Sequence, residues 1–557
     1  MPDAASRVLH LVAAESGWDT LDELAPALER GGAVVREHRL APARDVPEDD
    51  AERRRAELRL VEAAVRASDA DGGGLLLADE RGALAIPLRM RLLLEEAKLG
   101  WDEAWARTRA LTVSRFGCPG GEPSRPYWHL AFLEAEEPRL LEILFEINRR
   151  HLDAVETRWP GDGGRRRRLS LVREGEGRRL RLGLLAVVGS AHASVAAPWQ
   201  GPASEILADL AVLCGASLES RATPVHARRF LVDHNSPLAE LLAASLGAGW
   251  ADDPAVFQRL EPLAFEAPFR AAFRKARRAN RERLAAFLRR ATGVESDPEA
   301  LVDVRFGWLA ARERPLLSAL GLVREHLRLA AGGWTPPSPR TVVLARVGES
   351  QGERDDRLLA LLEAVAAAIN RDERVRKALR VAVLPSCDAA AARLLVASAD
   401  LANEPGTAGS GAASARALAF AASGAVMLGT RDGTLRELAG VVGEDNLFLF
   451  GLGPLETHAW REGRVYRPQD VYAIDPLVRI ALDGLVSSRY APKPGAFDWA
   501  RDALFDTRDP WLALADLGAY VHRQDEALAE FNDPRIFTEK AILTLARTRP
   551  LWVDRLE

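Results

Sequence analysis

The chain from residue 340 onward alternates short apolar runs with segments of helical periodicity. Residues 341–347 form an apolar run, as expected of a buried parallel strand. Residues 356–369 then place leucine, valine and isoleucine three or four positions apart, which is typical of an amphipathic helix. The pattern continues with a strand over 380–385, a helix over 390–399, and strands over 425–430 and 446–451. It predicts an α/β fold with a doubly wound parallel sheet.

A glycine-rich loop lies between two of these elements. Residues 406–411 read GTAGSG, and glycines let backbone N–H groups approach an anion closely. The alanine-rich run 412–422 favours a helix, so the loop leads into a helix N-terminus, where phosphate binds readily. In such sheets ligands bind beyond the carboxyl ends of the strands. The alternative interpretation is a plain tight loop. The candidate anion-binding residues are Thr407, Ala408, Gly409 and Ser410.

The composition is that of an ordinary globular protein. With 28% charged residues and a net charge of -5, the chain lacks the basic excess of nucleic-acid-binding proteins. No apolar run approaches the roughly 20 residues of a membrane span, and the first residues lack a signal-peptide pattern. Cys118, Cys214 and Cys387 are isolated and have no metal-ligand spacing. We therefore expect a cytoplasmic protein with no metal site, no nucleic-acid partner and no membrane association.

Residues 406–433, GTAGSGAASARALAFAASGAVMLGTRDG, resemble without a gap the cofactor segment of the glycogen and starch phosphorylases. The resemblance implies phosphorolysis of α-1,4-glucan to glucose 1-phosphate as the family activity. That family holds pyridoxal phosphate as a Schiff base on a lysine, and the corresponding position here is Ala419. An alanine methyl cannot form an imine, and none of the chain's five lysines follows a glycine-rich loop. The resemblance therefore predicts that the chain carries no pyridoxal phosphate.

The other functional positions implied by the resemblance are also changed. The family's phosphate-binding lysine, arginine and second lysine correspond to Gly307, Trp308 and Glu313, which we interpret as packing and surface residues. A carboxylate at 313 would repel a phosphate dianion at short range. The family's glucose-contacting histidine corresponds to Arg81, interpreted as a surface arginine, and a sugar-contacting glutamate corresponds to Gly411. We therefore expect no catalytic residues.

The resemblance extends over most of the chain but omits the first few hundred residues of the family's N-terminal domain. It implies two Rossmann-like lobes of the GT-B glycosyltransferase type. The first lobe, residues 1–221, is expected to be incomplete, and the second, 222–557, is expected to send its C-terminal helices back to the first. A separate polypeptide supplying the missing half is a possible partner, and the family's homodimer is not expected.

Three functional hypotheses follow. The first is a non-catalytic phosphorylase homologue that binds a glucan or sugar phosphate, or acts as a scaffold. The second is an enzyme of the glycosyltransferase type that acts on a glycosyl phosphate or glycan without a covalently bound cofactor. It predicts that changing Arg81 or Arg416 to alanine abolishes turnover. The third is a gene product with no retained ligand, against which the intact strand and helix pattern argues.

A few other polar groups are weaker candidates. The arginine run within 163–171 is interpreted as a solvated loop entering a helix. His192 and His234 are interpreted as structural. A carboxylate pair drawn from Asp79, Glu80 and Asp432 has no support in their spacing.

Overall fold

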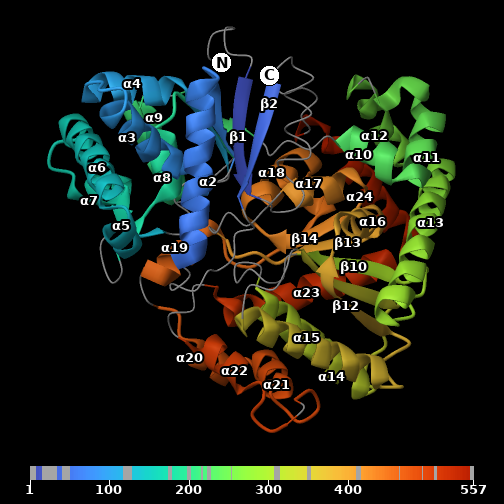
Figure 1. Cartoon of the computed structure of the whole chain (residues 1–557). Coiled ribbons are helices and arrows are strands. Elements are labelled where there is room, and N and C mark those ends of the chain that lie inside the picture. Colours follow the sequence, from blue (N-terminus) through green and yellow to red (C-terminus); the bar gives the residue numbers. More distant parts are fainter. Residues whose placement is uncertain are drawn as a thin grey trace. The chain divides into compact units, whose positions relative to one another are not determined.

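The computed structural model places most of the chain in two compact units. It describes residues 8–14, 34–40, 51–78, 80–116, 128–173, 178–196, 202–214, 217–221, 227–251, 254–306, 314–347, 353–408, 415–462, 465–491, 493–506 and 511–551. One unit comprises residues 1–222 with 555–557, and the other comprises 223–554. Figure 1 shows the elements of each. In the described part, every helix is too short or too polar to cross a membrane.

The first unit is built on a six-stranded parallel sheet with the strand order β2-β1-β3-β4-β8-β9. All four residues of β3 are buried, as a central strand covered on both faces requires. The strands are β1 Val8–Ala14, β2 Val34–Leu40, β3 Gly74–Leu77, β4 Thr112–Phe116, β8 His192–Ala196 and β9 Ser217–Arg221.

Helices and one small sheet surround these strands. Every residue of α8 Leu182–Val188 is buried, so this apolar helix lies inside the unit's core. The arginine run forms most of helix α7 Gly163–Leu169, which corrects its interpretation as a loop entering a helix. The helix starts there because the Asp162 carboxylate accepts a hydrogen bond from the Arg165 backbone N–H. The other helices are α2 Ala51–Ala70, α3 Ala85–Glu95, α4 Trp101–Ala110, α5 Leu130–Glu136, α6 Pro138–Arg158 and α9 Pro202–Cys214. The small antiparallel sheet has the order β5-β7-β6, with β5 Trp128–His129, β6 Val172–Arg173 and β7 Arg179–Leu180.

The second unit confirms the predicted doubly wound sheet. Its six parallel strands have the order β12-β11-β10-β13-β14-β15. Numbered along the chain this is 3-2-1-4-5-6, the order in which the winding direction reverses between the first and fourth strands. The reversal lies between β10 and β13. The strands are β10 Leu301–Phe306, β11 Arg340–Val347, β12 Leu379–Cys387, β13 Leu401–Glu404, β14 Val426–Thr430 and β15 Phe448–Phe450.

Helices cover both faces of this second sheet (Figure 1). Those after the first two strands, α14 Pro315–Ala330 and α15 Glu353–Arg371, lie on one face with α23 Ala513–Phe531. The other face carries α13 Ala267–Thr292, α16 Ala389–Ser398, α17 Ala415–Ala422, α18 Gly433–Val442 and α24 Pro534–Arg547. The remaining helices are α10 Ala227–His234, α11 Ser236–Leu246, α12 Leu260–Leu263, α19 Pro454–Glu462, α20 Pro468–Ile474, α21 Pro476–Leu485 and α22 Asp498–Phe505. The return of the C-terminal helices to the first lobe stays a prediction.

Candidate functional site at the carboxyl edge of the second sheet

The strand order defines where a ligand site is expected in the second unit. Strands β10 and β13 pair in parallel, with Asp303 beside Leu401, and their connections leave in opposite directions. A crevice outside the carboxyl ends of such a strand pair is the usual ligand position in doubly wound sheets. The segment after β13 is 405–408, the start of the glycine loop. The segment after β10, residues 307–313, lies outside the described residues.

The backbone of the loop is held by two side chains from neighbouring elements. Arg314, buried at the start of α14, donates from Nε to the Pro405 carbonyl at 2.8 Å and from Nη2 to the Gly406 carbonyl at 2.8 Å. The Thr430 hydroxyl, at the end of β14, donates to the same Gly406 carbonyl at 2.7 Å. These bonds fix the carbonyl groups of 405 and 406 toward α14 and β14.

Arg314 is itself paired with a buried carboxylate. Its Nη1 lies 2.6 Å from Asp516 Oδ2 on α23. The other oxygen, Asp516 Oδ1, accepts the Leu452 backbone N–H at 3.0 Å. Gly451 has a φ of +77°, and a Cβ there would lie 2.6 Å from Asp516 Oδ2. A glycine is therefore required beside this carboxylate. The sequence reasoning overlooked Arg314 and Asp516, because nothing in the sequence brings them together.

A polar network lies in the core where β10, β13 and α23 meet. Asp303 on β10 accepts from Arg305 Nη2 at 3.1 Å and from Asn403 Nδ2 on β13 at 3.4 Å. The Tyr520 hydroxyl of α23 donates to Asn403 Oδ1 at 3.3 Å. Burial raises the pKa of Tyr520, so its hydroxyl keeps its proton. The network joins β10, β13 and α23 at the point where the winding reverses, and so stiffens the base of the candidate site.

Two of the four candidate loop residues are placed by the structure. Thr407 and Ala408 are each 2% exposed, so the first half of the loop is packed into the unit. Gly409, Ser410 and also Gly411 lie outside the described residues. The predicted approach of their backbone N–H groups to an anion stays a prediction.

The helix that follows is short, apolar and buried. Ala417, Leu418, Ala419 and Phe420 on α17 are each at most 4% exposed. The Phe420 ring lies 5.5 Å from that of Phe306, the last residue of β10. The helix ends at Ala422, the last residue of the predicted helical run, and Gly424 follows with a φ of +78°, where a Cβ would lie 2.8 Å from the Phe273 ring. Helix α17 is thus packed into the core beside the end of β10, and position 419 carries only a methyl group.

The comparisons with known proteins identify the family. A family model described as carbohydrate phosphorylase matches residues 73–556. The chain belongs to this family. It is 30% identical to the glycogen phosphorylase of Haemophilus influenzae over 490 residues, 87% of this chain and 57% of that relative. It is 28% identical to the brain-form glycogen phosphorylase of Rattus norvegicus over 488 residues, 87% of this chain and 58% of that relative. The chain thus spans somewhat more than half the length of the curated relatives it matches.

The carbohydrate phosphorylase match begins within the first unit's sheet. Strands β1 and β2 precede residue 73, yet Leu9 to Val12 pair in register with all four residues of β3. The first 72 residues therefore supply two of the six strands of this sheet. The expected partner that completes the first lobe stays a prediction.

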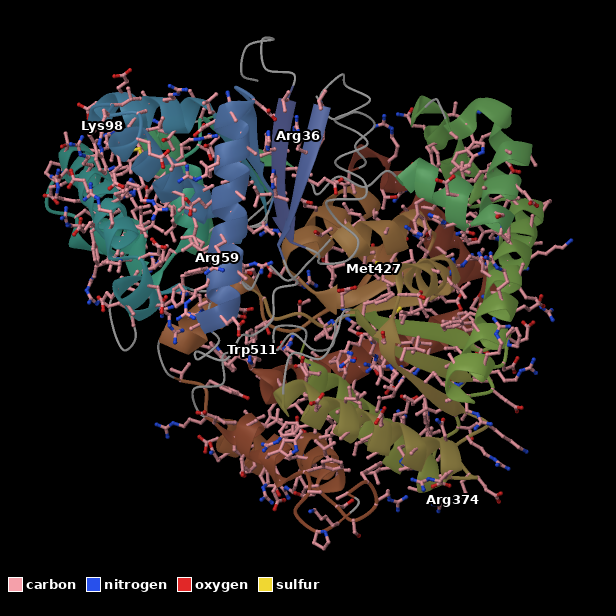
Figure 2. All side chains as sticks on the ribbon, viewed as in Figure 1. Arg36, Arg59, Lys98, Arg374, Met427 and Trp511 are labelled. Carbon is pink, nitrogen blue, oxygen red and sulfur yellow. The ribbon has the colours of Figure 1, made fainter. Side chains whose placement is uncertain are left out.

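All five lysines fall within the described residues, and none lies on α17. Lys98, Lys275, Lys377 and Lys493 are exposed, and Figure 2 labels Lys98 on the first unit. Lys540 on α24 donates to Glu530 Oε1 at 3.0 Å. No lysine of this phosphorylase homologue therefore lies on the helix that carries position 419.

The structure corrects the interpretation of Arg81 as a surface residue. Its side chain is 4% exposed and forms an ion pair with Glu57 of α2. Arg81 lies in the 3₁₀ turn Glu80–Leu84, directly before the buried start of α3, so the fold draws it inward. The pairing neutralises a charge that burial would otherwise penalise.

Among the remaining candidates, the structure places Asp432, His192 and His234. Gly307, Trp308 and Glu313 lie outside the described residues, as do Asp79 and the side chains of Glu80 and Arg416. Asp432 is buried between β14 and α18, and His234 ends α10 with its ring against Phe230. His192 begins β8. The described part of the chain contains no cluster of three side chains able to hold a metal ion.

Proposed function

We propose that this chain is a carbohydrate phosphorylase homologue that binds a glucan or sugar phosphate and does not catalyse phosphorolysis. The observation that carries the proposal is Ala419, a buried methyl group on α17 at the position that the family resemblance assigns to the cofactor lysine. A Schiff base requires an amine, and alanine has none. The α17 position therefore does not fit covalently held pyridoxal phosphate.

The distribution of charge supports the same proposal. The positions matched to the family's phosphate-binding cluster are Gly307, Trp308 and Glu313, which together carry no positive charge. Arginine cannot replace the missing lysine, because its guanidinium stays protonated and is a poor nucleophile. Phosphorolysis would thus lack both its covalent cofactor and the cations that hold the attacking phosphate.

The retained loop supports binding. Arg314 and Thr430 fix the backbone at Pro405 and Gly406, so the start of the loop keeps a defined shape. A fixed backbone before a helix N-terminus is suited to a phosphate group. The names of the relatives, glycogen phosphorylases, make an α-glucan or its sugar phosphate the ligand class we propose.

The test is an assay of the full chain with glycogen or maltoheptaose, inorganic phosphate and added pyridoxal phosphate. We expect no glucose 1-phosphate above the protein-free blank, while the Haemophilus influenzae relative, assayed in parallel, acts as the positive control. Calorimetric titration with maltoheptaose and glucose 1-phosphate should show saturable binding of at least one of them. Cofactor-dependent release of glucose 1-phosphate would refute the non-catalytic part, and absence of all binding would refute the ligand class.

The burial of Arg81 weighs against the alternative of an enzyme without a covalently bound cofactor. That hypothesis uses Arg81 as a hydrogen-bond donor to substrate, but its guanidinium is engaged by Glu57. The same assays, run with activated sugars as substrates, separate the non-catalytic hypothesis from this alternative. Turnover by the wild-type chain that is abolished by Arg81→Ala or Arg416→Ala would favour the enzyme. We also propose a cytoplasmic location. In addition, we propose that a separate protein partner completes the first lobe. If light scattering shows that the purified chain is a well-folded monomer, the reason for proposing such a partner disappears.

A further inference from the structure

The second unit has a surface pocket at the edge of the sheet opposite to the glycine loop. It lies at the connection between α15 and β12, near the amino ends of the strands. Figure 2 labels Arg374, which belongs to this connection. Its volume is about 640 Å³, within the range of small-molecule sites. It is lined by His326, Ala368, Arg371, Asp372, Glu373, Arg374 and Arg489.

The floor of the pocket is a fixed hydrogen-bond chain. His326, 1% exposed on α14, lies with Nε2 3.3 Å from Asp372 Oδ2 and with Nδ1 2.8 Å from the Tyr490 hydroxyl. Burial lowers the pKa of His326, so the ring is neutral near pH 7. The ring then donates to Asp372 and accepts from Tyr490. Since Tyr490 follows Arg489 directly, this chain also positions the backbone that carries Arg489.

The two acidic residues of the pocket are already matched by cations. Asp372 accepts from the Arg374 backbone N–H at 3.1 Å and from Arg374 Nη2 at 2.8 Å, in addition to His326. These bonds hold the pKa of Asp372 well below its usual range. Glu373 points an oxygen at Arg376, 3.4 Å away. Neither carboxylate therefore needs a further cation from the pocket.

Two guanidinium groups remain without a full partner. Arg371 donates from Nε to the Ala367 carbonyl within its own helix and has no carboxylate partner among the described residues. Arg489 approaches Asp372 Oδ2 only to 3.8 Å, beyond hydrogen-bond distance. They come from two different elements, α15 and the turn after α21, and both line the pocket.

We propose that this pocket binds a phosphate monoester, with Arg371 and Arg489 gripping the phosphate group from two sides. A guanidinium presents paired N–H donors that match phosphate oxygens, and two of them balance a dianion. A ligand with a single carboxylate carries one negative charge and would leave the charge of one guanidinium unbalanced. The volume beyond the arginines leaves room for a sugar-sized alcohol portion. The site is separate from the 405–408 loop and does not depend on the proposed function.

The experiment is calorimetric titration of the full chain with glucose 1-phosphate, inorganic phosphate and glucose at constant ionic strength. Because both arginines are on the surface, the variants Arg371→Ala, Arg489→Ala and the double variant should keep the wild-type melting temperature. Loss of two charge-assisted contacts should weaken glucose 1-phosphate binding at this site at least about tenfold. Lys377→Ala removes an equal charge from an exposed neighbour outside the pocket and is the matched control.

The proposal is supported if the glucose 1-phosphate binding seen with wild type disappears in the double variant and persists in Lys377→Ala. Any binding at the glycine loop would remain in the double variant, so the two sites are distinguished by their stoichiometry. The proposal is overturned if the double variant binds glucose 1-phosphate as wild type does, or if no saturable binding occurs. Inorganic phosphate binding as tightly as the ester would overturn the assignment to a monoester.

Discussion

Arg314 Nη1 and Asp516 Oδ2 lie 2.6 Å apart, although 202 residues separate them in the sequence. The side chain of Arg314 is fully buried and that of Asp516 is 6% exposed. Arg314 also holds two carbonyl groups of the glycine loop, so the pair connects the first turn of α23 to the loop through one guanidinium. Removing either partner leaves a buried charge without compensation.

We predict that Arg314→Ala strongly destabilises the second unit. Breaking a buried pair by removing one partner costs about 3–5 kcal/mol, and the Pro405 and Gly406 carbonyls each lose one donor as well. The control is Arg278→Ala on α13, whose side chain is 56% exposed beside Glu282, where the loss should be below about 1 kcal/mol. Urea unfolding measures both. Equal losses in the two variants would show that Arg314 does not stabilise the loop and α23.

Two glycine-to-alanine substitutions should change stability in opposite directions. At Gly429, in β14, an added Cβ would lie 2.3 Å from the Leu435 side chain and 2.5 Å from the Glu404 carbonyl oxygen, so Gly429→Ala should cost about 1–3 kcal/mol. At Gly440, in α18, no atom lies within 4 Å of the added Cβ, so Gly440→Ala should stabilise by about 0.5–1 kcal/mol through helix propensity. Melting temperatures of the two variants test both signs. A neutral Gly429→Ala would mean that β14 and β13 can separate at low cost.

The first unit should lose stability as the pH falls below about 6.5, the ordinary pKa of histidine. His10 Nδ1 lies 3.0 Å from His38 Nε2, and His10 Nε2 lies 3.2 Å from Asp71 Oδ2. Burial lowers the pKa of both histidines, despite the opposing effect of Asp71 on His10. The unfolded chain therefore binds protons at a higher pH than the folded chain does. The stabilisation is complete above the unfolded pKa and is lost as the pH falls from it toward the lower folded pKa.

The measurement is the unfolding free energy of wild type and of the double variant His10→Gln, His38→Gln at pH 7.5, 6.5 and 5.5. The variant should lose less stability between pH 7.5 and 5.5 than wild type. Its dependence should not vanish, because burial also lowers the pKa of His151 and His326. Identical slopes would show that His10 and His38 do not bind protons differently in the folded and unfolded chains.

Much of the second unit's fold was predictable from the sequence, because its strands are apolar runs and its helices are periodic. Strand β13 was not recognised, since it has only four residues and two of them, Asn403 and Glu404, are polar. Their burial depends on partners such as Tyr520, more than 100 residues away. Likewise, Arg277 in the charged segment of α13 is buried, because carbonyl groups at Ala397 and Ser423 accept its hydrogen bonds.

For the candidate site, the sequence indicates the glycine loop but not the side chains that fix its backbone. Arg314 and Thr430, which hold the carbonyl groups at the start of this loop, come from segments distant in the sequence. Arg81 shows the limit most clearly. Its sequence neighbours are typical of a surface turn, and its ion pair with Glu57, 24 residues earlier in the sequence, helps to make its burial favourable. Long-range ion pairs of this kind leave no periodic pattern in a single sequence.

Restoring a lysine at position 419 should not restore phosphorolysis. Ala419 is 4% exposed among apolar neighbours on α17, so a lysine there must bury an ammonium group or displace the helix. We expect Ala419→Lys to lose at least about 2 kcal/mol of stability. The matched control is Ala390→Lys, at an exposed position of α16, which should change stability by less than about 0.5 kcal/mol.

The activity of Ala419→Lys separates loss of the cofactor lysine from loss of the whole site. With pyridoxal phosphate, phosphate and maltoheptaose, we expect no glucose 1-phosphate from it, because Gly307, Trp308 and Glu313 supply no cation to hold the attacking phosphate. Borohydride reduction and mass measurement would report separately whether the new amine has reacted with the cofactor. Turnover by this variant would show instead that the phosphate-binding positions assigned from the family resemblance are wrong. In that case the chain would lack one amine and otherwise keep a working catalytic site.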